Sequence, residues 1–264
     1  MKISAEQLPA HLAADDYLRQ RLAPSPGDPL YLHLADLLEA LKTVAADAPI
    51  RVLDFGAGGS PYRSLFPNAD YKRADLPGDA TLDFHIDSNG TVDAPSASFD
   101  LVLSTQVLEH VRYPPVYFSE CQRLLRPGGM LVLSTHGMFE DHGCPYDFRR
   151  WTSDGLKHDL SDSGFESVQV SKLTSGGRAV IFLGVSWFHL LHQTTHKGWH
   201  RLLRVVTTLV HKARPMLNRL ADRLYPLHSV ADATQSPSTV YVAVFATGLK
   251  PAGEISSAPP HSNP

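Results

Sequence analysis

The chain has 264 residues, 43% of them hydrophobic, so it can bury one sizeable core but is too short for two full domains with linkers. Its 24 Lys and Arg nearly balance 27 Asp and Glu, and a formal net charge of −3 gives no global indication of nucleic-acid binding. The two cysteines, Cys121 and Cys144, fit neither a metal-ligand nor a CxxC spacing, and the first twenty residues lack a continuous apolar run. We therefore expect no metal, no signal peptide and a cytoplasmic protein.

Two helices are expected in the first part of the chain, over about residues 5–22 and 29–46, separated by the breaker sequence PSPGDP. We expect residues 1–48 to cover the core. From Ile50 the pattern changes to short apolar runs divided by Gly, Pro and Asp: IRVLDF, DYKRAD, FDLVLS and MLVLST. Helical stretches lie between several of them, a pattern typical of a parallel sheet that is buried on both faces.

The second half of the chain continues with a helix, a strand and an insertion. The helix is expected from Thr152, as its N-cap, to Ser163, with Gly164 at its end, and FESVQVSKL follows as a strand. Two helix-like segments fill residues 174–238 before TVYVAVFATG returns as a strand. Residues 49–248 should then form the main domain, and residues 249–264, rich in Pro, Ser and Ala, a disordered tail.

A glycine-rich turn follows the first buried strand in VLDFGAGGSPY. Gly56, Gly58 and Gly59 permit a tight turn and let a ligand approach the backbone, and Ser60 and Pro61 can begin the next helix. Such a turn alone is equally compatible with a dinucleotide site, a phosphate loop or an ordinary turn.

An acidic residue, Asp75, ends the next strand, 21 residues beyond Asp54. A carboxylate at this place can accept hydrogen bonds from two vicinal ribose hydroxyls, although it can also be a solvated turn residue before Leu76. Coupled to the glycine turn, the ribose interpretation is favoured. No Gly-Lys-Ser or Gly-Lys-Thr follows the glycines, which argues against a P-loop hydrolase.

Two further segments, FDLVLSTQVLEHV and LLRPGGMLVLST, complete a recognisable order of motifs. With the glycine turn and the strand-two acid they resemble the type 11 group of class I S-adenosylmethionine-dependent methyltransferases, over roughly half of the chain. The resemblance implies a Rossmann-like α/β fold with a mostly parallel central sheet, an antiparallel edge strand and helices on both faces, here carrying a helical insertion. It also implies S-adenosyl-L-methionine as the cofactor.

The resemblance assigns seven residues to the cofactor site: Asp54, Gly56, Gly58, Asp75, Asp87, Thr105 and Gln106. The first three line the methionine end, Asp75 holds the ribose, and Asp87 lies beside the adenine. Only eleven residues separate Asp75 from Asp87, too few for a full crossover helix and third strand. We expect an abbreviated connection, with Asp83 as the competing residue for the adenine.

A loop after the fifth strand, HGCPYDFRRWTSDGL, resembles a subgroup of the same family whose members often modify glycans or other cell-surface precursors. His142, Asp147 and Arg150 match its pattern and are the candidate catalytic residues; His136 lies nearby but outside the pattern. A histidine or aspartate here could take a proton from an acceptor hydroxyl. The alternative is that Asp147 pairs with an arginine and merely fixes the loop.

Glu109 and His110, which follow the fourth strand, are expected to have a structural or pocket-edge role. Within the insertion, RAVIFLGVSWFHLLHQ is shorter than a spanning helix, and the next helix carries an apolar face and many basic residues, with Pro215 expected to kink or divide it. That helix can dock on an anionic membrane surface, cover the sheet and acceptor pocket, or mediate oligomerisation.

The predicted function is methyl transfer to an oxygen, less readily to nitrogen or carbon, of a small-molecule or glycan-type acceptor. No nucleic-acid partner is expected, and peripheral contact with the inner face of the membrane and the oligomeric state stay open. The alternatives are a non-catalytic binding module with this fold and a dinucleotide-dependent oxidoreductase, which the later motifs disfavour.

Overall fold

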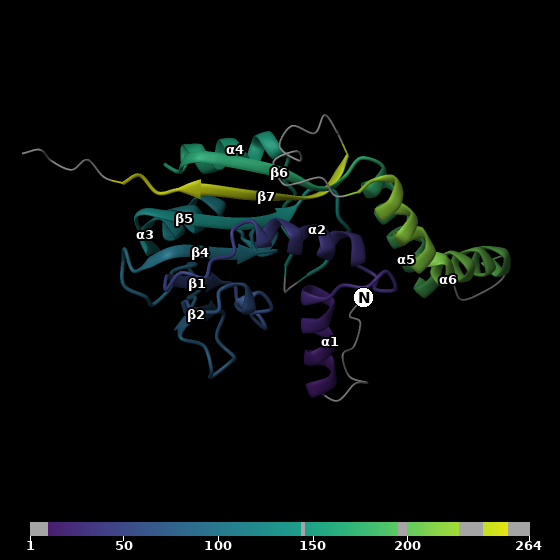
Figure 1. Ribbon diagram of the computed structural model, residues 1–264, viewed down its shortest axis with the longest axis horizontal. Helices are drawn as coiled ribbons and strands as arrows, with labels where there is room; N and C mark the ends of the chain where they lie inside the picture. The colour runs from purple at the N-terminus through teal and green to yellow at the C-terminus, as the bar shows by residue number, and fades with distance from the viewer. Residues whose placement is uncertain (1–9, 144–145, 195–199, 227–239, 253–264) are drawn as a thin grey trace, which may run out of the picture.

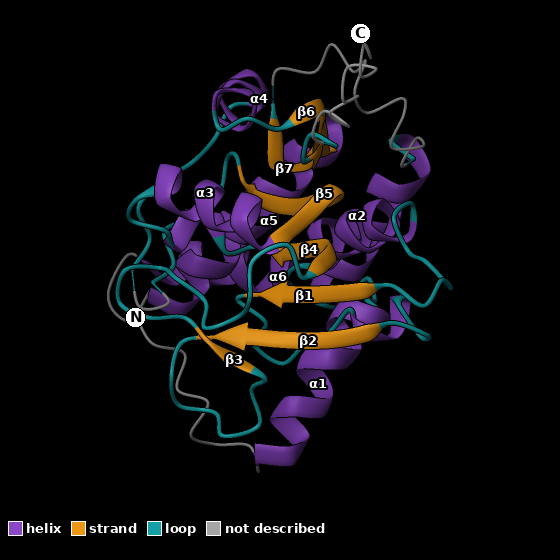
Figure 2. Ribbon diagram, turned by 90° about the vertical axis from the view of Figure 1, so that its left-hand side faces the viewer, coloured by secondary structure: helices purple, strands orange, loops and turns teal. Residues whose placement is uncertain are grey.

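A single twisted sheet organises the protein in a computed structural model that describes residues 10–143, 146–194, 200–226 and 240–252. The described residues form seven strands in the order β3-β2-β1-β4-β5-β7-β6, seen in cross-section in Figure 2. In chain order they are β1 (Arg51–Phe55), β2 (Asp70–Asp75), β3 (Phe84–His85), β4 (Phe99–Thr105), β5 (Leu125–His136), β6 (Glu166–Ser175) and β7 (Tyr241–Leu249). Strands β1 to β5 are parallel, whereas β7 runs antiparallel to both β5 and β6. The predicted Rossmann-like fold is confirmed.

Helices cover both faces of the sheet because the central strands are apolar on both faces. Side chains alternate along a strand, so in β4 Leu101 and Leu103 pack with α2 (Tyr31–Lys42), while Val102 packs on the opposite face. That opposite face is covered by α3 (Pro114–Leu124) and α4 (Ser153–Asp162). The predicted cap of α4 is confirmed, since Thr152 Oγ1 accepts a hydrogen bond from the Gly155 backbone N–H at 3.0 Å.

The connections beside the glycine turn are short. The expected helix at Ser60 and Pro61 is reduced to one 3₁₀ turn, Arg63–Leu65, because Ser60 adopts a positive φ of 48° that a helix cannot contain. Strand β3 has two residues and follows β2 without an intervening helix, which confirms the abbreviated connection. The predicted tail falls mostly on residues 253–264, which lie outside the described part of the chain.

The N-terminal cover and the insertion meet through a buried ion pair. Arg178, at the start of α5 (Gly177–Thr194), donates two hydrogen bonds of 2.7 and 2.9 Å to the carboxylate of Asp36 on α2. Arg178 also donates to Asp222 Oδ1 at 2.7 Å, on α6 (His200–Leu224). The pair therefore ties α2, α5 and α6 together, and the two insertion helices lie beyond one end of the sheet (Figure 1).

Helix α6 continues through Pro215, so this residue does not divide the helix, and the alternative expectation of a kink stays a prediction. Among the described helices, none combines the length and hydropathy that a bilayer span requires.

In the N-terminal cover, helix α1 (Ala10–Leu22) stands apart from the sheet and approaches it near the glycine turn.

Candidate active site

The glycine turn and the tip of β2 are held together by backbone hydrogen bonds. The N–H groups of Gly56 and Ala57 both donate to the Ala74 carbonyl, at 2.9 and 3.1 Å, and the Gly58 N–H donates to Asp75 Oδ2 at 2.7 Å. The structure thus brings together the two features that the sequence linked by spacing. They lie at the carboxyl edge of the sheet, where open α/β folds bind their ligands.

Gly56 is required by both conformation and packing. Its φ of +77° favours glycine, and an added Cβ would lie 2.5 Å from a methyl carbon of Val107. Gly58 also has a positive φ, +49°, and the ring of Tyr17 from α1 lies against Gly58 and Gly59. Arg21 stacks over that ring, 3.6 Å from its centroid. Helix α1 therefore covers the turn from outside, as expected for the N-terminal cover.

Asp54 is buried in β1 and accepts a hydrogen bond from the Tyr71 hydroxyl at 2.7 Å. Burial raises the pKa of Asp54 to about 7, because the charged carboxylate loses its hydration. The Tyr71 hydrogen bond opposes this shift. Asp54 thus forms a hydrogen bond with Tyr71 inside the protein and also lies beside the glycine turn.

The two adenine candidates both stabilise local structure. Asp87 is exposed and accepts hydrogen bonds from the backbone N–H groups of Asn89 and Thr91, at 2.8 and 2.9 Å, and the Thr91 bond lowers the pKa of Asp87. Asp83 accepts from the Arg73 N–H at 2.9 Å. Neither carboxylate is buried, and an adenine contact by either remains a prediction.

Gln106 directly follows β4, and its side-chain amide points into the site. Its φ is +56°, its N–H donates to the Ser134 carbonyl, and its Nε2 donates to Ser134 Oγ at 2.9 Å. The buried Oε1 atom meets no well-aligned donor among the described residues, and the buried His33 interacts with the Gln106 side chain. A ligand at this edge could supply a better-placed donor. Together with the glycine turn and Asp75, the Gln106 amide makes this edge suitable for a nucleoside-type cofactor.

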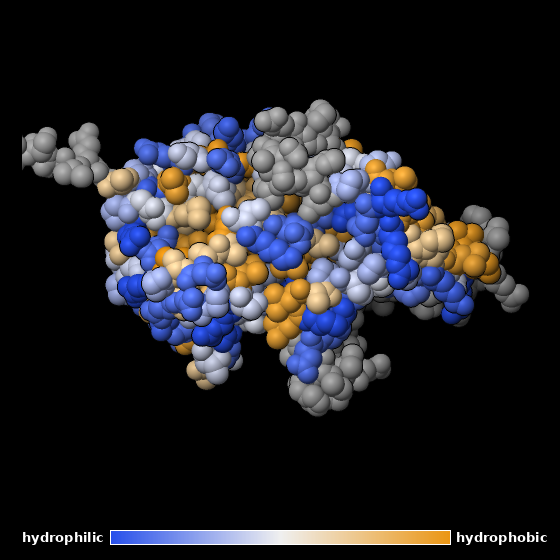
Figure 3. Space-filling view, in the orientation of Figure 1, coloured by the Kyte–Doolittle hydropathy of each residue, from blue (hydrophilic) through white to orange (hydrophobic). Residues whose placement is uncertain are grey.

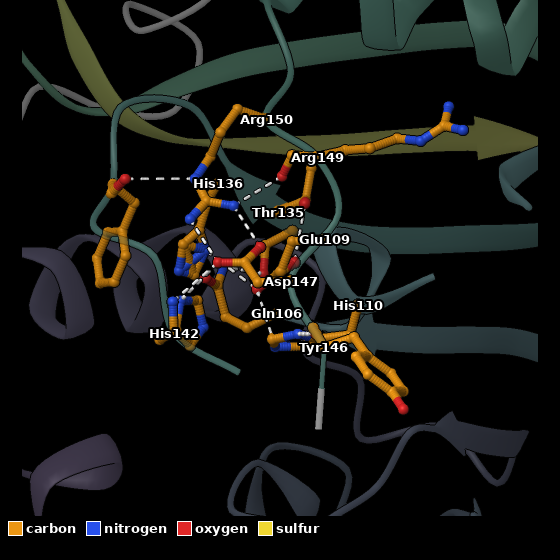
Figure 4. Close-up of polar contacts among 12 residues, drawn as sticks. Gln106, Glu109, His110, Thr135, His136, His142, Tyr146, Asp147, Arg149 and Arg150 are labelled. Atoms are coloured by element: carbon orange, nitrogen blue, oxygen red, sulfur yellow. Dashed lines mark hydrogen bonds and ion pairs between the residues drawn. The ribbon is translucent and has the colours of Figure 1, made fainter. Parts of the chain in front are cut away.

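A cluster of polar side chains surrounds this edge (Figure 4). Glu109 is fully buried, accepts a hydrogen bond from Thr135 Oγ1 at 2.8 Å, and has its Oε1 atom 3.0 Å from His136 Nδ1. The ring centroid of His142 lies 4.9 Å from that of His136 and 5.0 Å from that of His110. From the sequence, Glu109 was expected to have a structural or pocket-edge role, and His136 lay outside the motif. Because Glu109 follows β4 and His136 ends β5, their positions in the sequence could have indicated that both lie close to His142.

Asp147 and Arg150 form a two-pronged ion pair within the loop. Arg150 donates from both terminal nitrogens, at 2.5 and 2.6 Å, and Asp147 also accepts from the His142 backbone N–H at 2.9 Å. The hydrogen bonds from Arg150 hold the pKa of Asp147 well below its ordinary value, so this carboxylate is a weak base at neutral pH. This geometry matches the expected loop-fixing role, exerted here directly on His142.

The histidines differ in their access to solvent. His142 is partly exposed, with Nδ1 3.4 Å from Asp147 Oδ2, and desolvation lowers the pKa of its ring, which favours the neutral imidazole at pH 7. Burial lowers the pKa of His136 to about 2. His33 of α2, which the sequence analysis did not single out, is buried with its ring centroid 5.6 Å from that of His136. Among these rings, His142 is the one that a substrate can reach with least rearrangement.

Comparisons with known proteins agree with this architecture. Residues 30–170 match the family model described as "Methyltransferase domain". Curated relatives include the ubiquinone biosynthesis O-methyltransferases of Cereibacter sphaeroides, 33% identical over 101 residues, and Maricaulis maris, 29% identical over 102 residues. Each alignment covers 33% of this chain and 41% or 40% of the relative, so the chain matches well under half the length of these proteins.

Solved structures with the same fold are more distant in sequence. Phosphoethanolamine N-methyltransferase 2 of Haemonchus contortus, solved with S-adenosyl-L-methionine, aligns with a TM-score of 0.51 at 17% identity, over 91% of this chain and 56% of that one. The 4+2 cyclase SpnF aligns with a TM-score of 0.53 at 18% identity, over 92% and 94% of the two chains. The matched family model spans the glycine turn, the polar cluster and the loop after β5, and the chain belongs to the methyltransferase domain family, with the fold of the class I S-adenosylmethionine-dependent enzymes.

Proposed function

We propose that the protein transfers a methyl group from S-adenosyl-L-methionine to a hydroxyl oxygen of a small-molecule or glycan-type acceptor. One observation carries the proposal: Gln106 and His142 lie in one polar cluster (Figure 4), and Val107, next to Gln106, packs against Gly56 of the glycine turn. A cofactor-type site and a proton-accepting group are thus adjacent. The O-methyltransferase names of the curated relatives support an oxygen acceptor.

S-adenosylmethionine, when bound, supplies a methyl group that is already activated on a sulfonium. The protein then has to align the acceptor oxygen in line with the sulfur–carbon bond and exclude water. His142 would accept the proton of the acceptor hydroxyl as that oxygen takes up the methyl group. Asp147 and Arg150 act as positioning residues, because Asp147 holds the His142 backbone and faces its ring, and Arg150 fixes Asp147.

The decisive experiment combines binding and turnover. Calorimetric titration with S-adenosylmethionine and with NAD should give binding of the first only, and an acceptor screen should detect release of S-adenosylhomocysteine. Binding of NAD alone would favour the oxidoreductase. Cofactor binding without turnover across phenolic, sugar and amine acceptors would favour a non-catalytic binding module.

Asp75→Ala should weaken S-adenosylmethionine binding by about tenfold to a hundredfold, because a carboxylate that accepts ribose hydroxyls contributes about 1.5–3 kcal/mol. The same variant also frees the Gly58 N–H that orders the turn. Asp70→Ala, at the opposite end of β2, is the matched control and should bind normally. Unchanged affinity in Asp75→Ala would remove this residue from the site.

Helix α6 suggests a membrane contact, because its apolar side faces outward. The buried positions of its described part are Thr207, Arg214, Asn218 and Ala221. Two of them donate to the N-terminal segment, Asn218 to the Pro26 carbonyl at 2.8 Å and Arg214 to the Gly27 carbonyl at 3.5 Å. The exposed large apolar residues are Val205, Val206, Leu209, Met216, Leu220 and Leu224. Arg204, Lys212, Arg219 and Arg223 are exposed beside them. Figure 3 shows apolar side chains at the surface of the region formed by the two insertion helices. An apolar stripe flanked by cations suits an anionic lipid surface.

The protein should therefore co-sediment with anionic liposomes at low salt and be released as salt rises, because electrostatic docking is screened. Leu209→Asp combined with Met216→Asp should abolish sedimentation, whereas Val116→Asp, an exposed apolar position on α3, should not. A protein that stays in the supernatant at low salt contradicts lipid docking. If it is then dimeric in solution, a second copy covers the stripe instead.

A further inference from the structure

We propose that Glu109, His136 and His142 bind one divalent transition-metal ion. Each residue offers one ligand atom, and the three atoms lie within 4.8 Å of one another. They come from three places: the 3₁₀ turn Leu108–His110 after β4, the end of β5, and the loop that follows it. The sequence alone predicted no metal, since a ligand set drawn from three separate loops has no characteristic spacing.

Two of the ligand atoms face each other without a hydrogen bond. Glu109 Oε1 and His136 Nδ1 are 3.0 Å apart, yet both are buried and neither makes a hydrogen bond to any described residue. The two atoms lie at ion-pair distance from each other, and a cation bound by both is a second way to satisfy this buried pair. A cation placed between them would satisfy both lone pairs at once.

The donor types of all three residues and the spacing of the Glu109–His136 pair fit such an ion. Two ligands held at about 2.0–2.1 Å from tetrahedral zinc are separated by about 3.3 Å, close to the 3.0 Å found between Glu109 and His136. Two imidazoles with one carboxylate form a known ligand set for catalytic Zn²⁺, and the same set binds Fe²⁺ with positions left open. His142, the partly exposed member, leaves the outer side of the site open to a water or an acceptor.

Neighbouring residues orient the three ligands. Thr135 Oγ1 donates to Glu109 Oε2 at 2.8 Å, which directs the other carboxylate oxygen toward His136. Asp147 Oδ2 lies 3.4 Å from His142 Nδ1 and is itself fixed by Arg150. Carboxylates and hydroxyls in this position commonly set the orientation of metal ligands.

The catalytic consequence of the ion rests on the proposed function. Glu109, His136 and His142 would hold the ion, which would supply Lewis-acid chemistry by lowering the pKa of an acceptor hydroxyl beside it. His142 would then be a ligand in the metal-bound enzyme and the proton acceptor only in the metal-free enzyme.

The test uses the full chain, stripped with a chelator and titrated with Co²⁺, whose visible absorption reports coordination by nitrogen and oxygen. One Co²⁺ per chain is expected, displaced by Zn²⁺. His142→Ala and Glu109→Gln should weaken binding more than tenfold, whereas His158→Ala, an exposed histidine 3.3 Å from the carboxylate of Asp162, should bind as wild type. Thermal melting confirms that each variant folds, and Zn²⁺ should raise the melting temperature of the wild type but not of His142→Ala.

Two results would overturn the metal site: no Co²⁺ spectrum in the stripped wild type, or equal Co²⁺ affinity in wild type and His142→Ala. Calorimetry with S-adenosylmethionine and turnover of the metal-free enzyme, run on the same preparations, separate this failure from failure of the proposed function. A chain that binds the cofactor and transfers methyl groups but binds no ion keeps its function and loses only the metal.

Discussion

Replacement of His142 by alanine should lower turnover by about 10²–10⁴, the usual range for loss of a general base, while S-adenosylmethionine affinity stays unchanged. The separation is expected because His142 lies in the loop after β5, whereas the proposed ribose ligand, Asp75, ends β2. A side chain that acts on the acceptor affects the transition state and leaves cofactor binding intact. The measurement is release of S-adenosylhomocysteine with the acceptor that the screen identifies, alongside calorimetric cofactor affinity.

Neighbouring residues in the same loop provide further tests and a control for this prediction. Asp147→Asn and Arg150→Ala should also reduce turnover more than cofactor affinity, since they hold His142 in place. Arg149→Ala is the matched control, because within the described residues the Arg149 side chain makes one long hydrogen bond, of 3.4 Å, to the Arg112 carbonyl. If all variants lose melting temperature and cofactor binding together, with no separate kinetic defect, the loop is structural.

Sequence patterns predicted the sheet because each strand is encoded locally. The runs FDLVLS and MLVLST are apolar and bounded by turn residues, and their pairing follows from the rules for parallel sheets. Strand β3 was not predicted as such, because a two-residue strand carries no periodicity and exists only through its pairing with β2.

The polar cluster could not be predicted in the same way. Glu109 and His136 are 27 positions apart and become neighbours only because β4 and β5 end at the same edge.

The orientation of α6 could not be predicted from the sequence either. Its periodicity indicated an apolar face, yet the face that packs inward carries Thr207, Arg214 and Asn218. Backbone carbonyls of the N-terminal segment accept hydrogen bonds from Arg214 and Asn218. Which face is buried depends on partners far away in sequence.

Asp36→Ala should lower the free energy of unfolding by about 3–5 kcal/mol, because it leaves the buried Arg178 guanidinium without its main counter-charge. Both side chains are buried, at 0% and 6% exposure, so water cannot replace the lost carboxylate. Asp222 also pairs with Arg178 but is only partly buried, and it offers a weaker substitute. Urea denaturation followed by circular dichroism measures the change.

The same helix provides the control for this buried pair. Glu39 and Lys42 on α2 form an exposed ion pair of 2.6 Å, and Glu39→Ala should change stability by less than about 0.5 kcal/mol, because solvent screens that pair. Asp36→Leu combined with Arg178→Met should recover part of the loss, since an apolar pair leaves no buried charge. A loss below about 1 kcal/mol in Asp36→Ala would show that water reaches Arg178. The junction of α2, α5 and α6 would then be open to solvent, and the insertion would be held mainly by apolar contacts such as those of Phe182 and Ala221 with Leu32.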